Sequence, residues 1–316
     1  HPDWVLGVPG RTPPLGRGQY VLDLIRPEVA DNIFGQLDKL LSDHPIAYLK
    51  WDMNRDLTHP ASAGRPASHR QTRAVYALID RLRAAHPTVE IESCASGGGR
   101  ADYEILKRTD RIWTSDCNDP FERQSIQAGF ALFFPPEVMG AHVGPAASHT
   151  TARTSSLDFR TMTALFGHMG IEADIRRFSP ADLALLGARL ALHKQWRPLL
   201  HSGRSLRQTH PDPGAIGRLM VSADAALASY AQLETPAYAT LANLKLNGLP
   251  PETEFEVRLL NVSPRPTAAM KHILALARGE PIRATGQMLR TIGLPLPVLR
   301  AGEIAVFLLE PVPAQP

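Results

Sequence analysis

The chain has two different sequence patterns, and the change from one to the other constrains its fold more than any other feature. Up to about residue 200, strand-like apolar runs alternate with helical segments, a pattern typical of parallel α/β proteins. After Gly203, strand-like segments follow one another with no long helix between them. The sequence therefore predicts an α/β part over residues 1–203 and a small antiparallel β domain, arranged as a sandwich, over residues 204–316.

Each part has its own set of candidate elements. The five candidate parallel strands of the first part are Ile46–Trp51, Val89–Ser93, Arg111–Thr114, Val138–Val143 and His168–Ala173. The helices predicted among them are Glu28–Ser42, Arg70–Ala85, Glu122–Phe134 and Pro180–Arg197, the last with Ser179 as its N-cap. The candidate strands of the second part are Leu219–Ser222, Leu227–Leu233, Phe255–Asn261 and Ile304–Leu309.

Charge and cysteine content limit the classes of partner and compartment. The formal net charge is +3, and Lys and Arg are spread along the chain, so nothing argues for a nucleic-acid partner. No apolar run is long enough to predict a membrane span. Cys94 and Cys117 are too few for a disulfide framework, so we expect free thiols and a cytoplasmic location. The chain starts at His1 rather than Met, so we expect it to begin inside a longer gene product or after processing.

Polar residues follow three of the predicted strands at the point where each strand ends. Asp52, Cys94 and Asp116 come directly after apolar runs, and in a (β/α) barrel such strand ends converge at one face. Two carboxylates there can act as a nucleophile and a general acid, the pair that glycoside hydrolysis requires. Lys50 and Asn54 flank Asp52 and are suited to sugar hydroxyl groups, and we expect Lys50 to keep Asp52 ionised.

Other interpretations of these residues stay open at this point. An Asp after a strand is often only the N-cap of the next helix. Gly97–Gly99 could hold a phosphate group, although they match neither the Walker pattern nor a dinucleotide fingerprint. The cluster Asp116–Asp119 could bind a metal, but it lacks a suitably spaced His partner. Trp51 and Trp113 could fill a core or stack on a sugar. Composition and periodicity alone therefore indicate an α/β hydrolytic enzyme.

Four short motifs, in order along the chain, carry a resemblance to family 36 glycoside hydrolases, the bacterial α-galactosidases. They are Gly16–Gln19 before Val21–Asp23, Lys50–Arg55, Cys94–Arg100 with Asp102, and Trp113–Asp116 with Asn118 and Asp119. The resemblance covers about residues 1–200 closely. It implies a partial (β/α)8 barrel of the TIM type, made of the later barrel strands, followed by the β domain.

The resemblance also implies an activity and a set of site residues. It implies a retaining α-galactosidase that removes terminal α-linked galactose from melibiose or raffinose by double displacement, without a metal or organic cofactor. Asp52 is the implied nucleophile and Asp116 the implied acid/base. The implied galactose-binding residues are Arg17, Lys50, Asn54, Cys94, Gly97 and Trp113.

Two departures from the family pattern qualify this interpretation. Cys117 and Asn118 occupy the middle of the acid/base motif, which leaves Asp116 itself in place. The family also carries an N-terminal domain and three barrel strands upstream, so we expect this chain to be a fragment, with any homo-oligomer formed through the full-length protein. The rival hypotheses are an α-N-acetylgalactosaminidase, a galactosyl-transferring relative and a non-catalytic galactoside-binding fragment. Cys94 argues against the first, because it is implied to lie near the 2-position of the sugar.

Overall fold

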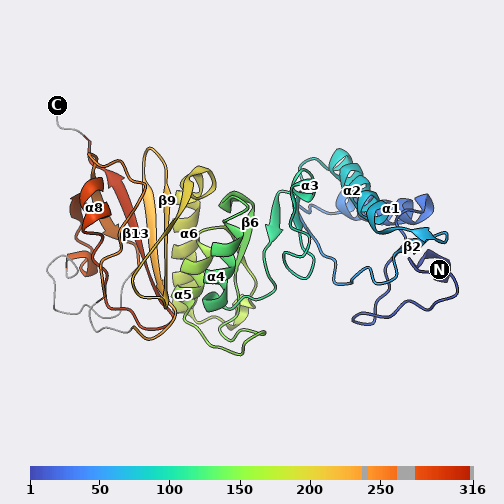
Figure 1. The fold of residues 1–316 in the computed structure, drawn as a ribbon, viewed down its shortest axis with the longest axis horizontal. Coiled ribbons are helices and arrows are strands. Elements are labelled where there is room, and N and C mark those ends of the chain that lie inside the picture. The colour runs from blue at the N-terminus through green and yellow to red at the C-terminus, as the bar shows by residue number, and fades with distance from the viewer. Residues whose placement is uncertain (237–240, 262–274, 314–316) are drawn as a thin grey trace. The chain divides into compact units, whose positions relative to one another are not determined.

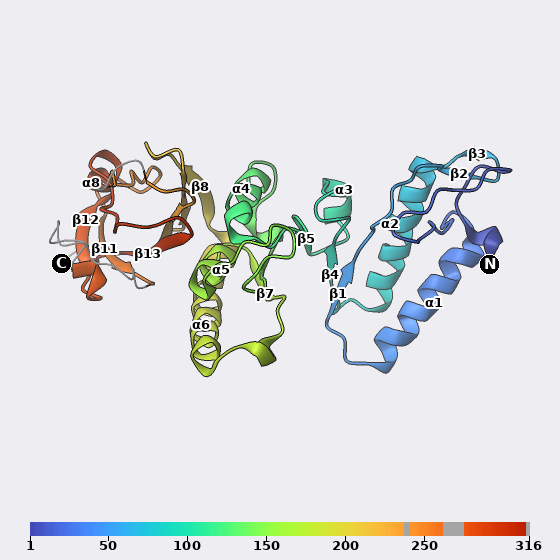
Figure 2. The same ribbon diagram turned by 90° about the horizontal axis from the view of Figure 1, so that it is seen from below.

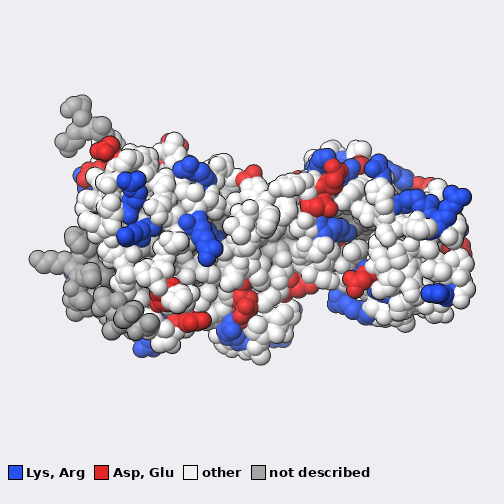
Figure 3. Space-filling model, in the orientation of Figure 1, with Lys and Arg blue, Asp and Glu red and all other residues white. Residues whose placement is uncertain are grey.

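A computed structural model describes residues 1–236, 241–261 and 275–313, and the chain divides into two compact units. The first unit is His1–Asp116 and the second is Cys117–Pro316. All the residues that the sequence singles out as a candidate site lie in the first unit. Charged side chains of both signs are interspersed with uncharged ones on the face shown in Figure 3, which agrees with the spread of Lys and Arg along the sequence.

The first unit alternates helices with three parallel strands. Its main elements are α1 (Pro27–Asp43), β1 (Tyr48–Trp51), α2 (Ser68–Ala85), β4 (Glu90–Ser93), α3 (Tyr103–Leu106) and β5 (Arg111–Trp113), with a short hairpin of β2 (Ala61–Ser62) and β3 (Arg65–Pro66). The strands pair in the order β1, β4, β5, with Lys50 opposite Glu92 and Ser93 opposite Ile112. Helices α1 and α2 lie side by side (Figure 2).

The two-residue period of β1 decides which side chains face the helices. Leu49 and Trp51 pack against a small apolar cluster that includes Leu41 of α1 and Leu82 of α2. Because successive side chains of a strand point to opposite faces, Tyr48 and Lys50 belong to the other face of the sheet. The same alternation continues on β4 and β5, and it produces the polar face on which the candidate site is built.

The second unit begins with the same alternation of helix and parallel strand. Its elements are α4 (Pro120–Phe130), β6 (Met139–Val143), α5 (Leu157–Ala164), β7 (His168–Ile171) and α6 (Pro180–Ser202), with 3-10 turns η2 (Pro136–Val138) and η3 (Ile175–Arg177). Strands β6 and β7 are parallel, with Gly140 opposite His168. Ser179 caps α6 as predicted, and it forms a capping box with Asp182.

A six-stranded antiparallel sheet fills the rest of the second unit. Its strands are β8 (Arg204–Gln208), β9 (Ala215–Val221), β10 (Ala226–Gln232), β11 (Glu254–Leu259), β12 (Ile282–Thr285) and β13 (Glu303–Pro311), paired in the order β12-β11-β13-β10-β9-β8. One face packs with α5 and α6, and the other packs with loops and with α8 (Gly286–Thr291) (Figure 1). Both faces are therefore buried over the central strands.

The predicted fold class is confirmed: five parallel strands alternate with helices, and an antiparallel sheet follows. All five parallel strands lie where the sequence places them, as do the four predicted helices and the four later strands. Among the described helices and strands, the prediction omitted α3, α5, β8, β12, α8 and the β2–β3 hairpin. A separate sandwich domain over residues 204–316 remains a prediction, since the strands described there form one sheet. Within the described ranges, no helix combines the length and apolarity that crossing a bilayer requires.

Candidate active site

The polar face of the first unit's sheet carries charged side chains in successive layers. Arg111 of β5 forms an ion pair with Glu90 of β4. One layer further along the strands, Lys50 Nζ lies 3.6 Å from Glu92 Oε1 and 4.5 Å from the centre of the Trp113 ring. Asp52 and Cys94 follow at the ends of β1 and β4. The three strands therefore deliver their polar side chains to one face and to one end of it.

Asp52 lies at the end of β1 and is exposed, and four hydrogen-bond donors surround its carboxylate. Partial burial opposes its ionisation, but hydrogen bonds from the Cys94 thiol, the Asn54 amide and the backbone N–H groups of Met53 and Ser96 outweigh that effect and lower its pKa. The hydroxyl group of Ser96 donates in turn to Asn54 Oδ1 at 3.3 Å. The side chain is thus held ionised and oriented, as a nucleophile requires.

Lys50 is placed differently from the sequence-based expectation. We expected Lys50 to keep Asp52 ionised, but its ammonium group pairs with Glu92, and the largest contributions to the low pKa of Asp52 come from neutral donors. Glu92 is fully buried, and Tyr48 also interacts with it. Register explains the correction, because Lys50 lies directly opposite Glu92 on the neighbouring strand.

The thiol of Cys94 connects the two carboxylates. Its side chain is buried and hydrogen bonds to Asp52, and its Sγ lies 4.0 Å from Asp116 Oδ1. Burial raises the pKa of this thiol to about 12, and the neighbouring Asp52 carboxylate adds to the effect. The indole N–H of Trp113 donates to the same Asp116 oxygen at 3.1 Å. Asp52 and Asp116 therefore lie on a single site with one neutral thiol in contact with both.

Gly97 allows the loop after β4 to approach the segment that carries Asp116. Its φ is +85°, and a Cβ atom there would lie 2.7 Å from the Cα of Ser115. Ser96 also adopts a left-handed conformation, with φ of +49°. A larger residue at position 97 would push the two loops apart. The turn therefore serves close backbone packing beside Asp116, and the phosphate loop considered above is not needed to explain its glycines.

Arg17 lies in the turn Gly16–Gln19, where its φ is +53° and its side chain is exposed. Among the residues that the structure describes, no hydrogen bond or ion pair links its guanidinium group to Asp52 or Asp116. The segment that leads into this turn is nevertheless attached to the loop after β1, because Arg55 of that loop donates to the carbonyl of Pro14. Arg17 is thus carried by a segment that is tied to the Asp52 loop.

Arg100 was not predicted as a site residue, although it ends one of the four motifs. Its guanidinium group donates to the carbonyls of Trp51 at 3.1 Å and Cys94 at 2.8 Å. Burial lowers the pKa of Arg100. These two carbonyls precede or belong to site residues, so Arg100 ties together the ends of β1 and β4. The position of a lone Arg in a Gly-rich loop gives no sequence signal for such a role.

The structure does not support a helix-capping role for Asp52 or Asp116, nor a metal site at Asp116. The helix N-caps in this region are Asp102, which caps α3, and Asp119, which caps α4. Neither Asp52 nor Asp116 caps a helix. Across the described parts of the chain, no group of three or more His, Cys, Asp and Glu side chains is placed to hold a metal ion. Neither Cys94 nor Cys117 forms a disulfide, as predicted.

A cavity of about 480 Å³ reaches Asp52 from the side of the helices. Its walls are mainly apolar, with Leu22, Trp51 and Met53 among them, and its polar groups include Arg100. This volume lies within the range of small-molecule sites. Asp52 therefore borders an open cavity beside the helices as well as the polar face of the sheet.

The comparisons with known proteins identify the family. A family model described as Melibiase matches residues 1–203. An α-galactosidase of Escherichia coli is 42% identical over 98% of this chain, and α-galactosidase AgaA of Geobacillus stearothermophilus is 36% identical over 83% of it. The chain belongs to the melibiase family of glycoside hydrolases.

Solved structures agree with this assignment. A variant of the Geobacillus stearothermophilus enzyme AgaA, in complex with raffinose, matches 99% of this chain with a TM-score of 0.87 and 31% sequence identity. The match covers 42% of that protein's chain. The chain likewise spans 45% of the Escherichia coli relative and 37% of AgaA in sequence. It therefore corresponds to less than half of these relatives.

Proposed function

We propose that this chain carries the catalytic carboxylates of a retaining α-galactosidase, with Asp52 as nucleophile and Asp116 as acid/base. The observation that supports this most is the arrangement around Cys94, whose thiol hydrogen bonds to Asp52 and lies 4.0 Å from an oxygen of Asp116. A retaining mechanism needs its two carboxyl groups about 5–5.5 Å apart, closer than the roughly 6.5–9.5 Å of an inverting one. Because both carboxylates lie next to the same thiol, their arrangement favours the shorter separation of a retaining enzyme.

In the first step, an oxygen of Asp52 attacks the anomeric carbon of the galactosyl group as the bond to the leaving oxygen breaks. Asp116 gives its proton to that oxygen, so the leaving group departs as an alcohol. In the second step, Asp116 removes a proton from water, the water oxygen bonds to the anomeric carbon, and Asp52 is released. Both steps invert the anomeric centre, and the product therefore retains its configuration.

The surrounding residues have separate tasks in this proposal. Asn54 orients the nucleophile through its amide, and Trp113 positions Asp116 through its indole N–H. Lys50, with Arg17, would donate to the sugar hydroxyl groups, and Gly97 would let the sugar approach the backbone beside Asp116. Cys94 remains a neutral thiol at working pH because its pKa is about 12, so it contributes shape and a weak donor without adding charge.

Galactosyl oligosaccharides are the substrate class that we propose. Variants of the relative AgaA have been crystallised with raffinose and with stachyose. Melibiose is the smallest substrate of the class that we expect the full protein to use. Neither Cys94 nor Cys117 forms a disulfide, which agrees with a reducing compartment, so we place the proposed activity in the cytoplasm.

Proton NMR during hydrolysis of 4-nitrophenyl α-galactoside tests the proposal. We expect α-galactose as the first product, and Asp52→Ala should abolish turnover of every α-galactoside. Asp116→Ala should retain more activity on this substrate than on melibiose, since nitrophenolate departs without a proton. Asp56→Ala is the matched control, because Asp56 is an exposed carboxylate on the same loop. β-Galactose as the first product would exclude the retaining mechanism.

The same assay separates the rival hypotheses. Turnover of the 2-acetamido analogue at a rate similar to that of the galactoside would favour an α-N-acetylgalactosaminidase. Formation of new galactosides in place of free galactose, with melibiose as acceptor, would favour a transferase. Saturable binding of galactose without turnover of any α-galactoside would favour a galactoside-binding fragment. Cys94 beside both carboxylates argues against the first of these, because an acetamido group needs the space that the buried thiol occupies.

A further inference from the structure

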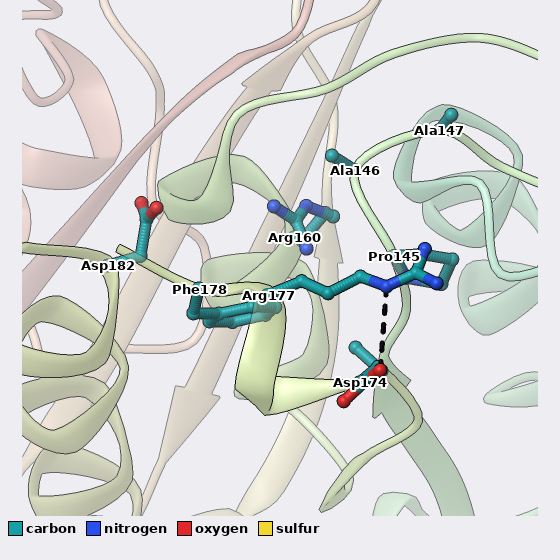
Figure 4. Close-up of a pocket in the computed structure, with 9 residues that line it drawn as sticks. Pro145, Ala146, Ala147, Arg160, Asp174, Arg177, Phe178 and Asp182 are labelled. Carbon is teal, nitrogen blue, oxygen red and sulfur yellow. Dashed lines mark ion pairs between the residues drawn. The ribbon is translucent and has the colours of Figure 1, made fainter. Parts of the chain in front are cut away.

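A second cavity lies wholly within the second unit, and none of its lining residues belongs to the candidate active site. Its volume is about 460 Å³, within the range of small-molecule sites. It opens between the loop after β6 and the loop after β7, near the N-terminal turns of α5 and α6 (Figure 4). The strand ends concerned are carboxyl ends, where α/β proteins commonly bind ligands.

Arg160 of α5 is the buried polar group of this cavity. Its side chain is 7% exposed, and one guanidinium nitrogen, Nη1, donates to the carbonyl of Gly144 at 2.6 Å. Its Nε has no hydrogen-bond partner within the described residues. A buried guanidinium group with unused donors is costly unless a ligand or water completes its hydrogen bonds. Arg160 is thus held in place by one hydrogen bond and keeps at least one N–H donor for a ligand.

Asp182 supplies an acceptor to the same cavity. One of its carboxylate oxygens, Oδ2, is used by Ser179 in the capping box of α6, while Oδ1 accepts no hydrogen bond in the part of the chain that the structure describes. Asp174 is already paired, since it accepts from Arg176 and forms an ion pair with Arg177 at 3.5 Å. In Figure 4, Arg160 appears between Asp182 and the Arg177–Asp174 pair.

Phe178 provides a fixed apolar wall. It packs against the apolar cluster that includes Val143 and Leu186, and it also lines the cavity. The remaining wall is small and apolar, being formed by Pro145, Ala146, Ala147 and Ala173. An aromatic ring that is held by the core on one side and borders a cavity on the other can serve as a platform for a flat, weakly polar ligand face.

The charges in the cavity favour a neutral ligand over an anion. The two cations Arg160 and Arg177 are balanced by the two carboxylates Asp174 and Asp182, so a bound phosphate group would face two negative charges. A hydroxyl group accepts from a guanidinium group and donates to a carboxylate at the same time. A ring that bears several hydroxyl groups on its rim and C–H groups on its faces matches both the polar groups and Phe178.

We propose that this cavity is a saccharide-binding site that takes one neutral hexopyranose ring, with Phe178 as the platform and Arg160 and Asp182 as partners of neighbouring hydroxyl groups. The site does not depend on the activity proposed above, because it shares no residue with Asp52, Asp116 or their neighbours. It gives the chain a second position at which a sugar unit can be held.

Residue-resolved NMR titration of the isotopically labelled 316-residue chain with glucose tests the proposal. We expect saturable shifts of the backbone amides of Gly144, Ala146, Ala147 and residues 173–178, with a dissociation constant in the millimolar range. Phe178→Ala and Asp182→Asn should each weaken this binding at least about tenfold, a difference that the titration resolves easily. Phe133→Ala is the matched control, because Phe133 is 73% exposed on the same unit and lies outside the cavity.

Three results would overturn the proposal. They are the absence of saturable shifts at these amides, shifts produced by inorganic phosphate but not by glucose, and unchanged glucose binding in both cavity variants. Thermal melting of each variant shows whether it is folded. Asn has nearly the same size and shape as Asp, so the Asp182→Asn variant, at a half-buried position, stays informative if Phe178→Ala unfolds. Asp52→Ala should leave the glucose shifts at the cavity amides unchanged, so failure of the proposed catalytic function would be seen separately.

Discussion

Strand β1, which ends at Asp52, and strand β10, at the centre of the antiparallel sheet, show two different uses of a β-strand. All seven residues of β10 are buried, because apolar clusters cover both of its faces. In β1 exposed residues alternate with half-buried ones, and the exposed face carries Tyr48 and Lys50. The comparison indicates that β10 stabilises the fold by packing on both faces. Strand β1 packs on one face only, and its other face carries polar side chains of the candidate active site.

The largest expected effect tests the packing side of this comparison. Phe307 of β13 is fully buried opposite Ala228 of β10. Phe307→Ala should lower the free energy of unfolding by about 3–5 kcal/mol, the usual cost of a large core truncation. Urea denaturation followed by circular dichroism measures this change. The exposed control Phe133→Ala should change stability by less than about 0.5 kcal/mol, and a similarly small loss for Phe307→Ala would break the comparison.

A buried titratable group should make stability depend on pH. Burial lowers the pKa of His193 from 6.5 to about 4 in the folded chain. Between these pH values the unfolded chain binds a proton at His193 that the folded chain does not. The free energy of unfolding is therefore highest above pH 6.5 and falls as the pH drops toward 4. The expected loss is on the order of 3 kcal/mol for this group.

Denaturation over this pH range, compared between the wild-type chain and His193→Asn, checks the prediction. Asn keeps a donor toward the carbonyl of Leu165, which His193 contacts at 3.3 Å, but it cannot take up a proton. The variant should therefore show a shallower pH dependence than the wild type. Identical slopes in the two proteins would contradict the assignment to His193.

An intermediate effect tests whether the polar face of β1 also supports the fold. Lys50 is one partner of the fully buried Glu92, at 3.6 Å. Lys50→Met should cost about 1–2 kcal/mol, less than for a fully buried pair because the Lys50 side chain is 32% exposed. The double variant Lys50→Met with Glu92→Gln should cost less than the sum of the two single changes. Strict additivity in this cycle would show that the pair contributes nothing to stability.

The smallest expected effect concerns the reactivity of one thiol. With a pKa of about 12 instead of 9.0, Cys94 holds about a thousandth as much thiolate as an ordinary cysteine. The higher intrinsic nucleophilicity of a more basic thiolate offsets part of this difference, so alkylation by iodoacetamide at pH 8 should be at least about tenfold slower at Cys94 than at Cys117. Peptide mass spectrometry measures both rates. Equal rates would show that Cys94 is neither buried nor held by Asp52.

The sequence was informative where a polar residue follows an apolar run. Asp52 and Asp116 could be predicted as candidate site residues, because a charged side chain at the end of an apolar strand contributes nothing to core packing. The burial of Glu92 and its pairing with Lys50 could not be predicted, because a Glu inside a strand is normally expected to face solvent. Only the register of the two strands places it beside Lys50. The same lack of register led to the wrong expectation that Lys50 would keep Asp52 ionised.

Two missed elements show why the fold was predicted less completely. Helix α5 is buried on every side except near Asp158, so its apolar residues lack the one-sided spacing that marks a surface helix. Strand β8 begins at Arg204 and alternates weakly, because it is an edge strand of the sheet. The catalytic roles of the site residues came from a resemblance between motifs and not from periodicity.

Identification of the residue that bears a trapped galactosyl group tests the central claim most directly. A fluorinated galactosyl fluoride forms the covalent intermediate quickly and releases it slowly, so the labelled chain can be digested and its peptides analysed by mass spectrometry. The account predicts one galactosyl group per chain, attached through the carboxylate of Asp52 and absent from Asp52→Ala. A label on Asp116, or on any residue other than Asp52, would contradict the assignment of the nucleophile.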